Sequence, residues 1–310
     1  MKIKKNLRIG TRGSLLAMKQ ANEVKEELEK KFPEMRAQSS IDIIKIKTSG
    51  DINQNQSLSE IGGKGLFSKE IDQALLRSEV DLAVHSLKDL ETAIPEGIVL
   101  VSVLKREDVR DAMLSNKVSS LASLGRGNVV GTCSPRRKAH LLRLHPHLQC
   151  VDLRGNLQTR MQKLENGNCD AMILAMAGLN RLGIASLVKE VIPIETILPA
   201  VAQGAIGITC RKGDKKIIEL VKMVNDKQTM DCVKCERSML AALGGTCNTP
   251  IGGLAVFNNK NEIWLRGILV KPDGTEAFHA SCTGMAVESE KIGYDVEIEL
   301  YKKAGSNFFE

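Results

Sequence analysis

Short apolar strands alternate with amphipathic helices along most of this chain, and this alternation limits the fold more than any other feature. Leu7-Arg8-Ile9 predicts a strand that stops at Gly10, and Ser14 is a plausible N-cap for the helix that follows. The same order recurs between residues 41 and 104 and between residues 129 and 182. Strands that alternate with helices form parallel sheets, so we expect α/β domains.

Two interruptions of this alternation predict domain boundaries. The stretch 105–111 is charged and is expected to contain no strand, and a second crossing is expected near Pro199-Ala200. After a helix near 226–243, three strands separated by turn sequences predict an antiparallel meander, which an amphipathic helix closes. We therefore expect one α/β domain from 1–104 and 200–222, a second from 105–199, and a small α+β domain from 223–310.

Composition excludes several classes of protein. The 310 residues are 43% hydrophobic and 26% charged, without an apolar run near the roughly 20 residues of a membrane helix. The N-terminal segment lacks the apolar core of a secretion signal, and eight cysteines without export predict free thiols in a reducing compartment. We expect a cytoplasmic protein, although a processed organellar protein would have the same features.

The formal net charge of +7 indicates an anionic partner. The chain has no basic tail or block of Lys and Arg, and its aromatic content of 3% leaves few platforms for stacked bases. A small polyanion therefore fits this charge better than a nucleic acid or a membrane surface does.

Basic residues collect where predicted strands end and helices begin, which is the edge of a parallel sheet where ligands bind. Arg136 and Arg137 lie in the first turn of a helix that starts after Ser134, where cations oppose the helix dipole unless a bound anion offsets the cost. Any one of these side chains is more simply a solvated surface residue. As a set they predict an anion-binding cleft between two domains, lined by Arg12, Lys64, Lys88, Arg136, Arg137, Arg154 and Arg160.

Two further residues could carry chemistry. Asp89, beside Lys88 and close to His85, could move a proton or stabilise a cation, although an ordinary loop Asp–Lys pair is the simpler interpretation. Cys247 lies between the glycine pairs 244–245 and 252–253. Its loop therefore either lets a bulky group approach the thiol or buries the thiol as a small apolar side chain.

Other chemistries have weaker support. The Gly-rich segment around Lys64 matches neither a P-loop nor a dinucleotide fingerprint, which argues against ATP and NAD. Cys232 and Cys235 lie inside one predicted helix, with no second closely spaced ligand pair and no strand before them. We therefore expect neither a zinc site nor a redox-active disulfide, and no metal is predicted.

Ordered motifs extend over essentially the whole chain. They are Thr11-Arg12-x-Ser14, Gly62-Gly63-Lys64-Gly65-Leu66-Phe67, Ala83-Val84-His85-Ser86-Leu87-Lys88-Asp89, Arg106-Glu107-Asp108, Gly131-Thr132-Cys133-Ser134-Pro135-Arg136-Arg137, Leu153-Arg154-Gly155-Asn156, Ala175-Met176-Ala177-Gly178-Leu179, Leu198-Pro199-Ala200-Val201-Ala202-Gln203-Gly204 and Cys247-Asn248-Thr249-Pro250-Ile251-Gly252. In this order and at this spacing they resemble the porphobilinogen deaminase family, also called the hydroxymethylbilane synthases.

This resemblance implies a fold and an activity. The fold is two periplasmic-binding-protein-like α/β domains plus a small C-terminal α+β domain with an antiparallel sheet. The activity is that of a transferase of tetrapyrrole and heme biosynthesis, which deaminates four porphobilinogen molecules, joins them head to tail and releases hydroxymethylbilane and ammonia. The resemblance also implies a dipyrromethane cofactor, held by a thioether to Cys247, that primes the growing chain, and a monomeric enzyme.

The resemblance also assigns roles to single residues. Asp89 matches the catalytic aspartate, which would help to protonate the leaving amine and to stabilise the resulting azafulvene cation. The matches for binding the cofactor or growing chain are Lys64, Lys88, Ser134, Arg136, Arg137 and Arg160. The matches on the substrate side are Arg12, Ser14, Gln20, Arg154, Arg181 and Gln203. The basic members suit the acetate and propionate groups of pyrroles, because guanidinium groups pair bidentately with carboxylates.

Four positions depart from the family pattern. Leu15, Glu91 and Val109 stand where the family usually has proline, and Thr246 stands where it usually has glycine. These changes put loop geometry and hinge stiffness in question, but they remove no reacting group.

Two other functions remain as alternatives. A non-catalytic anion-binding protein of periplasmic-binding-protein type would explain two α/β domains and a basic cleft. It also predicts a signal peptide or a fused helix-turn-helix, which the sequence does not show, and it leaves Cys247 and Asp89 without roles. A hydrolase with a thiol nucleophile lacks a matching His–acid pattern.

Overall fold

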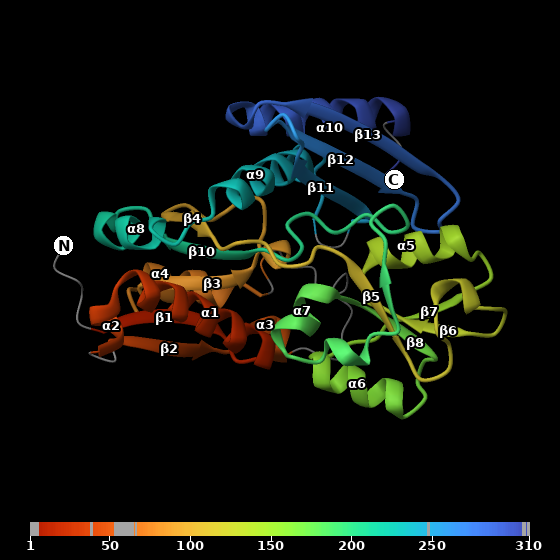
Figure 1. Ribbon diagram of the computed structural model, residues 1–310, viewed down its shortest axis with the longest axis horizontal. Coiled ribbons are helices and arrows are strands. Elements are labelled where there is room, and N and C mark those ends of the chain that lie inside the picture. The colour runs from red at the N-terminus through yellow and green to blue at the C-terminus, as the bar shows by residue number, and fades with distance from the viewer. Residues whose placement is uncertain are drawn as a thin grey trace. The chain divides into compact units, whose positions relative to one another are not determined.

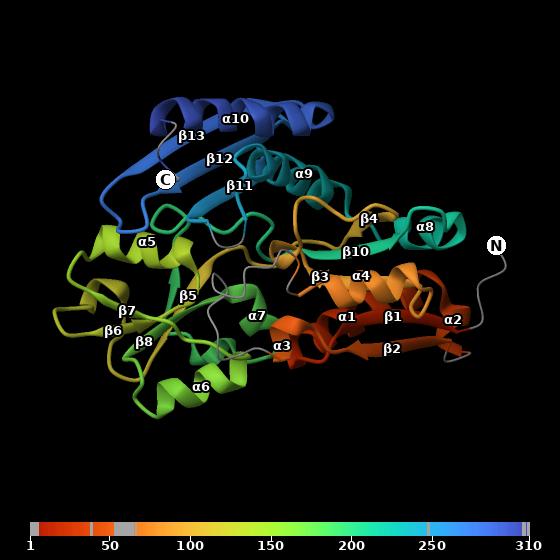
Figure 2. The ribbon, with the colours of Figure 1, turned by 180° about the vertical axis from the view of Figure 1, so that it is seen from behind.

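The computed structural model describes residues 6–37, 40–52, 65, 67–246, 249–305 and 308. The chain divides into two compact units, Met1–Glu107 with Ala205–Met230 and Asp108–Gly204 with Asp231–Glu310. Figure 1 and Figure 2 show their helices and strands from opposite sides.

The first unit is built on a five-stranded sheet with the order β2-β1-β3-β10-β4. Strand β1 pairs in parallel with β2 and with β3, whereas β10 runs antiparallel to both β3 and β4. The strands are β1 (Leu7–Arg12), β2 (Ile41–Ile46), β3 (Leu82–Ser86), β4 (Ile98–Val103) and β10 (Ile206–Arg211). The helices are α1 (Leu15–Lys31), α2 (Pro33–Ala37), α3 (Ser49–Ile52), α4 (Lys69–Leu76), the 3-10 turn η1 (Leu87–Asp89) and α8 (Lys215–Lys222).

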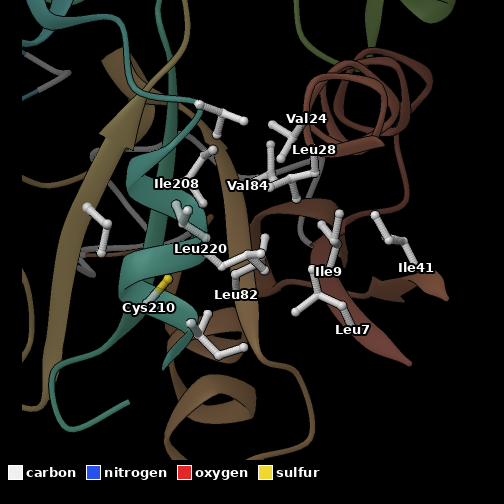
Figure 3. Close-up of a cluster of buried hydrophobic side chains, with 14 of the residues drawn as sticks. Leu7, Ile9, Val24, Leu28, Ile41, Leu82, Val84, Ile208, Cys210 and Leu220 are labelled. Atoms are coloured by element: carbon white, nitrogen blue, oxygen red, sulfur yellow. The ribbon is translucent and has the colours of Figure 1, made fainter. Parts of the chain in front are cut away.

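Alternate residues of these strands enter two separate cores, as the two-residue period of a strand requires. Leu82 and Val84 of β3 pack with Leu28 of α1 and Leu220 of α8 on one face of the sheet (Figure 3). Ala83 belongs to a second apolar cluster that includes the buried side chains of α4. Helices therefore cover both faces of the sheet, and its strand ends remain available for a site.

The second unit contains another five-stranded sheet, with the order β7-β6-β8-β5-β9. Met113 of β5 packs with Leu141 of α5, whereas Leu114 packs with Leu164 of α6 and Leu179 of α7. The strands are β5 (Asp111–Ser115), β6 (Val129–Gly131), β7 (Gln149–Val151), β8 (Ala171–Ala175) and β9 (Glu190–Ile192). The helical segments are η2 (Leu121–Ser123), α5 (Pro135–Leu144), α6 (Leu157–Glu165), α7 (Met176–Arg181) and η3 (Ala185–Leu187).

A three-stranded antiparallel meander completes the second unit. It consists of β11 (Ile251–Phe257), β12 (Ile263–Val270) and β13 (Ala277–Gly284), followed by η4 (Ala286–Glu288) and α10 (Ser289–Ala304). The long helix α9 (Lys227–Ala242) precedes it. A Cβ atom on Gly267 of β12 would meet Met239 of α9 as well as Val296 and Leu300 of α10, so both helices pack on the same face of this sheet.

The predicted fold class, two α/β sheets followed by a small antiparallel α+β region, is confirmed, but three details differ. Both large sheets are mixed, because β10 and β5 enter them antiparallel to a neighbour. Strand β5 begins at Asp111, within the stretch expected to have no strand, and β1 continues through Arg12. A strand contributed by a distant segment is paired through non-local hydrogen bonds, which a local apolar pattern does not reveal.

Gly293 allows α9 and α10 to cross closely, so Gly293→Ala is expected to destabilise the second unit. An added Cβ would lie 2.5 Å from the carbonyl oxygen of Cys235 and 2.8 Å from the amide nitrogen of Met239, and backbone atoms cannot move aside cheaply. Overpacking of this kind costs about 1–3 kcal/mol of unfolding free energy, which urea denaturation measures. Gly125→Ala is the control, because only Asn128 Oδ1, at 3.9 Å, lies within 4 Å of the added methyl group. Equal unfolding midpoints for the two variants would contradict close packing at Gly293.

Candidate active site

A pocket opens at the carboxyl ends of β1 and β3 in the first unit. These strands are parallel neighbours, with Ile9 opposite Leu82 and Gly10 opposite Ala83, so their ends meet at one edge of the sheet. The pocket is lined by Thr11, Arg12, Ser14, Leu16, Ala17, Gln20, Phe67, Ser68, Ile71, Val84, His85, Ser86 and Asp89. Four side chains singled out in the sequence, namely Arg12, Ser14, Gln20 and Asp89, thus come together here.

The N-terminus of α1 contributes positive potential to this pocket. Ser14 is the N-cap, as predicted, and its Oγ accepts a hydrogen bond from the Ala17 amide at 3.3 Å. No acidic residue occupies the first turn of this 17-residue helix, so the N-terminal amides and the dipole are not neutralised locally. A carboxylate bound in the pocket would be stabilised by this helix end.

Arg12 is held in place by two partners within the first unit. Its guanidinium forms two hydrogen bonds with the carboxylate of Asp51, at 2.5 and 3.3 Å, and lies 4.2 Å from the ring centroid of Phe67. Burial by itself would raise the pKa of Asp51, but hydrogen bonds from Arg12 and Thr48 outweigh burial, so the pKa lies below its ordinary value. The orientation of Arg12 at the pocket therefore depends on an acid that the sequence analysis did not single out.

Asp89 ends the 3-10 turn η1, which follows β3 directly, and its side chain is exposed at the pocket. The neighbouring Lys88 is half-buried. Behind Asp89, the Ser86 hydroxyl donates a 2.9 Å hydrogen bond to Oε1 of Gln20, and Nε2 of the buried His85 lies 3.0 Å from the Thr209 hydroxyl. The exposed Asp89 carboxylate therefore shares a pocket lining with side chains that are fixed by hydrogen bonds of their own.

In the second unit, Arg136 and Arg137 are buried around a single carboxylate. Arg136 Nη2 lies 2.8 Å from Oδ2 of Asp111, and Arg137 Nη2 lies 2.7 Å from Oδ1. Burial by itself would raise the pKa of Asp111, but the charges of Arg136 and Arg137 hold that pKa well below its ordinary value. Asp111, a residue of the same chain, therefore supplies the negative charge that two arginines at a helix N-terminus require.

Gln203 joins the same cluster. Its side chain is 0% exposed, and its Nε2 donates to the Val109 carbonyl at 2.7 Å and to Asp111 Oδ1 at 2.9 Å. The next residue, Gly204, accepts a 3.0 Å hydrogen bond from Nη2 of Arg181. The turn thus contains one predicted substrate-side residue, Gln203, and contacts another, Arg181, as well as the Asp111 carboxylate.

Ser134, Arg154 and Arg160 follow the carboxyl ends of the parallel neighbours β6 and β7. Ser134 caps α5 and accepts from the Arg137 amide, as predicted, and Arg160 Nε donates to the Gly155 carbonyl at 2.9 Å. Burial raises the pKa of the intervening Cys133 thiol, and the nearby charges of Arg160 and Arg154 oppose that rise. Two half-buried guanidinium groups therefore lie near one strand edge of the second unit.

The described residues on either side of Cys247 form local hydrogen bonds after the end of α9. Gly244, with φ of 63°, ends the helix in a Schellman motif: its amide bonds to the Ala241 carbonyl and the Gly245 amide to the Leu240 carbonyl. Thr246 and Thr249 then exchange two hydrogen bonds, of 3.0 and 3.1 Å. Cys247 and Lys64 both lie outside the described residues, so their predicted roles stay predictions.

Most of the glycines that flank Cys247 make room for side chains of the protein itself. Added Cβ atoms on Gly245, Gly252 and Gly253 would meet Ile251 at 2.5 Å, Ile268 at 2.8 Å and Met239 at 2.6 Å, respectively. Three of the four glycines therefore admit the protein's own side chains rather than a bulky ligand. Gly244 has open space around it and serves as the left-handed helix cap.

The departures from the family pattern have local consequences. Leu15 exposes 54% of its surface in the first turn of α1. Glu91 Oε1 accepts the Gly65 amide at 3.2 Å, a contact that proline could not make. Val109 supplies the carbonyl that binds Gln203, and Thr246 closes its loop with Thr249.

The make-up of the described residues bears on metal binding and on membrane insertion. Among them, no group of three or more His, Cys, Asp or Glu side chains could hold a metal ion. Cys232 and Cys235 are buried in α9 and form no disulfide bond. In the same part of the chain, no helix is long and apolar enough to cross a membrane.

Sequence reasoning found the basic residues but missed their acidic partners. Asp51 lies 39 positions from Arg12, and Asp111 lies 25 positions from Arg136. The only available signal was an isolated acid at the start or end of a charged loop, which is common in any sequence.

The chain is similar to known proteins in sequence and, more distantly, in structure. Residues 7–219 match the family model "porphobilinogen deaminase, dipyromethane cofactor binding domain", and residues 230–302 match the corresponding C-terminal domain. A chloroplastic porphobilinogen deaminase of Oryza sativa is 45% identical over 98% of this chain and 86% of its own length. The Nitrobacter hamburgensis enzyme is 45% identical over 97% and 94%. A periplasmic substrate-binding protein of Coxiella burnetii covers 72% of this chain and 94% of its own, with 15% identity and a TM-score of 0.45.

His140, which lies beside Arg136 in α5, is expected to make stability depend on pH. Burial lowers its pKa from 6.5 to about 3, and the charge of Arg136 adds to this effect. Since the unfolded state binds a proton that the folded state does not, stability is full above pH 6.5 and falls as the pH drops from 6.5 towards 3. The slope from one proton is about 1.4 kcal/mol per pH unit.

Urea unfolding at pH 7, 5 and 4 measures this slope. His140→Leu, which cannot be protonated, is expected to show a shallower loss of unfolding free energy than the native chain. Parallel losses in the two proteins would show that His140 is not responsible.

Proposed function

The chain belongs to the porphobilinogen deaminase family, and from this premise we propose that it is a hydroxymethylbilane synthase of tetrapyrrole biosynthesis. It deaminates four porphobilinogen molecules and joins them head to tail, releasing hydroxymethylbilane and ammonia. One observation carries the proposal: matched residues from β1, from α1 with its N-cap and from η1 line a single pocket, namely Arg12, Ser14, Gln20 and Asp89. The two family models favour this transferase over a non-catalytic anion-binding protein.

The polar groups of the pocket fit a dipyrromethane, whose pyrroles carry carboxylates and N–H groups. The α1 N-terminus and the Arg12 guanidinium suit the carboxylates, and the exposed Asp89 carboxylate suits the N–H groups. When bound through a thioether to Cys247, this cofactor supplies the pyrrole carbon to which the first substrate unit is joined.

Asp89 handles protons on the substrate. As an acid it donates a proton to the aminomethyl nitrogen of porphobilinogen, and the carbon–nitrogen bond breaks to release ammonia. Its carboxylate then stabilises the cationic pyrrole that remains. When the next carbon–carbon bond forms, Asp89 accepts the proton displaced from the attacking carbon, which restores the acid for another cycle.

The remaining matched residues bind carboxylates or orient groups that do. The family match assigns a substrate-binding role to Arg12, Ser14, Gln20, Arg154 and Arg181, and the guanidinium groups among them suit the acetate and propionate of the substrate. Contacts to the cofactor and the growing chain come from Lys64, Lys88, Ser134, Arg136, Arg137 and Arg160. For Arg136, Arg137 and Gln203, direct contact with a ligand requires part of their bonding to Asp111 to be exchanged, because all three are buried around it.

The proposal extends to the setting of the enzyme. It acts as a cytoplasmic monomer, without a metal, a nucleic acid or a membrane as partner. Its functional domains are residues 1–104 with 200–222, residues 105–199 and residues 223–310. The net charge of +7 suits the growing polycarboxylate.

Intact-mass spectrometry tests the cofactor and its attachment. The native protein is expected to be heavier than its sequence by one dipyrromethane, because the primer is covalent. Cys247→Ser is expected to lose this extra mass, whereas Cys282→Ser, which alters another free thiol, should keep it. An unmodified native mass that persists after porphobilinogen is added would refute the proposal.

Asp89→Asn is expected to keep the extra mass but to lower kcat for porphobilinogen at least about 100-fold, since an amide cannot exchange the proton. Hydroxymethylbilane formation is the measured rate. Asp42→Asn, an exposed position on β2, is the matched control and should retain native kcat. Native turnover in Asp89→Asn would exclude the catalytic role.

A further inference from the structure

Glu236 of α9 is a buried acid with no place in the reaction described above. Its side chain is 0% exposed, and its two oxygens accept hydrogen bonds from two main-chain amides in different segments. Oε2 accepts from Ala202 at 2.7 Å, and Oε1 accepts from Ala255 of β11 at 2.8 Å. Both distances are those of strong, charge-assisted hydrogen bonds.

The segment bound to Oε2 is a turn with an unfavourable backbone. Ala202 has φ of 59° and Gly204 has φ of 87°, and the Gln203 amide closes the turn onto the Ala200 carbonyl at 3.0 Å. An alanine in the left-handed region suffers from its Cβ and remains there only when its surroundings impose the conformation. The hydrogen bond from the Ala202 amide to Glu236 is such a constraint, because it binds the strained residue itself.

This turn carries two contacts of the proposed site. Gln203 reaches Asp111 Oδ1 at 2.9 Å and the Val109 carbonyl at 2.7 Å, and the Gly204 carbonyl accepts from Arg181 at 3.0 Å. A rotation of the Ala202 peptide would move Gln203 and Gly204 together. The conformation of the turn therefore sets the position of Gln203 directly and affects the Arg181 side chain through its hydrogen bond to Gly204.

We propose that Glu236 is a positioning residue, whose buried carboxylate holds the Ala202–Gly204 turn so that Gln203 and Arg181 are placed for substrate. The inference rests on the proposed function for its kinetic consequence, but the link between Glu236 and the turn stands without it. A carboxylate is suited to this place because both of its oxygens only accept, and the two groups that face them are N–H donors. In Glu236→Gln, one of the two donors would face an NH2 group instead.

The experiment compares Glu236→Gln, the double variant Glu236→Gln/Ala202→Gly, and Ser238→Ala. Glycine adopts the left-handed region without a Cβ penalty, so the double variant needs less external restraint at the turn. Ser238→Ala is the control for α9, because it removes the hydrogen bond to the Glu290 carbonyl without touching the turn. Amide hydrogen exchange of the peptide 199–207 and the kinetics of porphobilinogen consumption are measured for each protein.

Glu236→Gln is expected to speed exchange in 199–207 and to raise KM about tenfold or more while kcat changes less, as for a loss of binding energy. The double variant should recover most of both effects, and Ser238→Ala should show neither. If Glu236 served only to bind the Ala255 amide of β11, the Ala202→Gly substitution would restore neither the exchange rate nor KM. Unchanged exchange, or faster exchange with native KM, would overturn the proposal.

If the native protein does not consume porphobilinogen, the proposed function fails. The exchange rates of the three variants then decide by themselves whether Glu236 holds the turn.

Discussion

A single buried carboxylate, Asp111, organises the interior of the second unit. Two guanidinium groups and one amide converge on it, and all of these side chains are almost fully buried. Charges are costly to bury, and removing one partner from such a group leaves an uncompensated charge, which costs roughly 3–5 kcal/mol. The first turn of α5, the start of β5 and the turn at Gln203 are therefore tied to each other by an interaction that tolerates little displacement.

The two sheets place chemical groups by the same rule. In the first unit, the ends of β1 and β3 bring Arg12 and Asp89 to one pocket because the strands are parallel neighbours. In the second unit, the ends of β6 and β7 bring Arg154 and Arg160 near Cys133. Acids complete both arrangements: Asp51 orients Arg12, and Asp111 neutralises Arg136 and Arg137. In both units, internal carboxylates thus fix the orientation of these arginines.

Much of the site could be predicted because its basic members sit at recognisable places. Ser134 was predicted as an N-cap and is one, and the position of Arg136 after it indicated that an anion must lie nearby. The sequence could not show that this anion is Asp111, since contacts 25 residues apart depend on how β5 and α5 pack. The glycines around Cys247 illustrate the same limit: their conformational freedom was visible in the sequence, but the side chains that fill the space come from α9, β11 and β12.

The sequence by itself determined most of the strands and helices, and the family. These follow from short-range rules, because side-chain periodicity, capping and turn chemistry act within a few residues of the chain. Only the tertiary structure decided that the sheets are mixed, that Arg12 pairs with Asp51, and that Glu236 supports the turn at Ala202. Those outcomes depend on distances between segments far apart in sequence. The hydrogen bonds and ion pairs concerned are strong only within about 3 Å, so packing alone selects them.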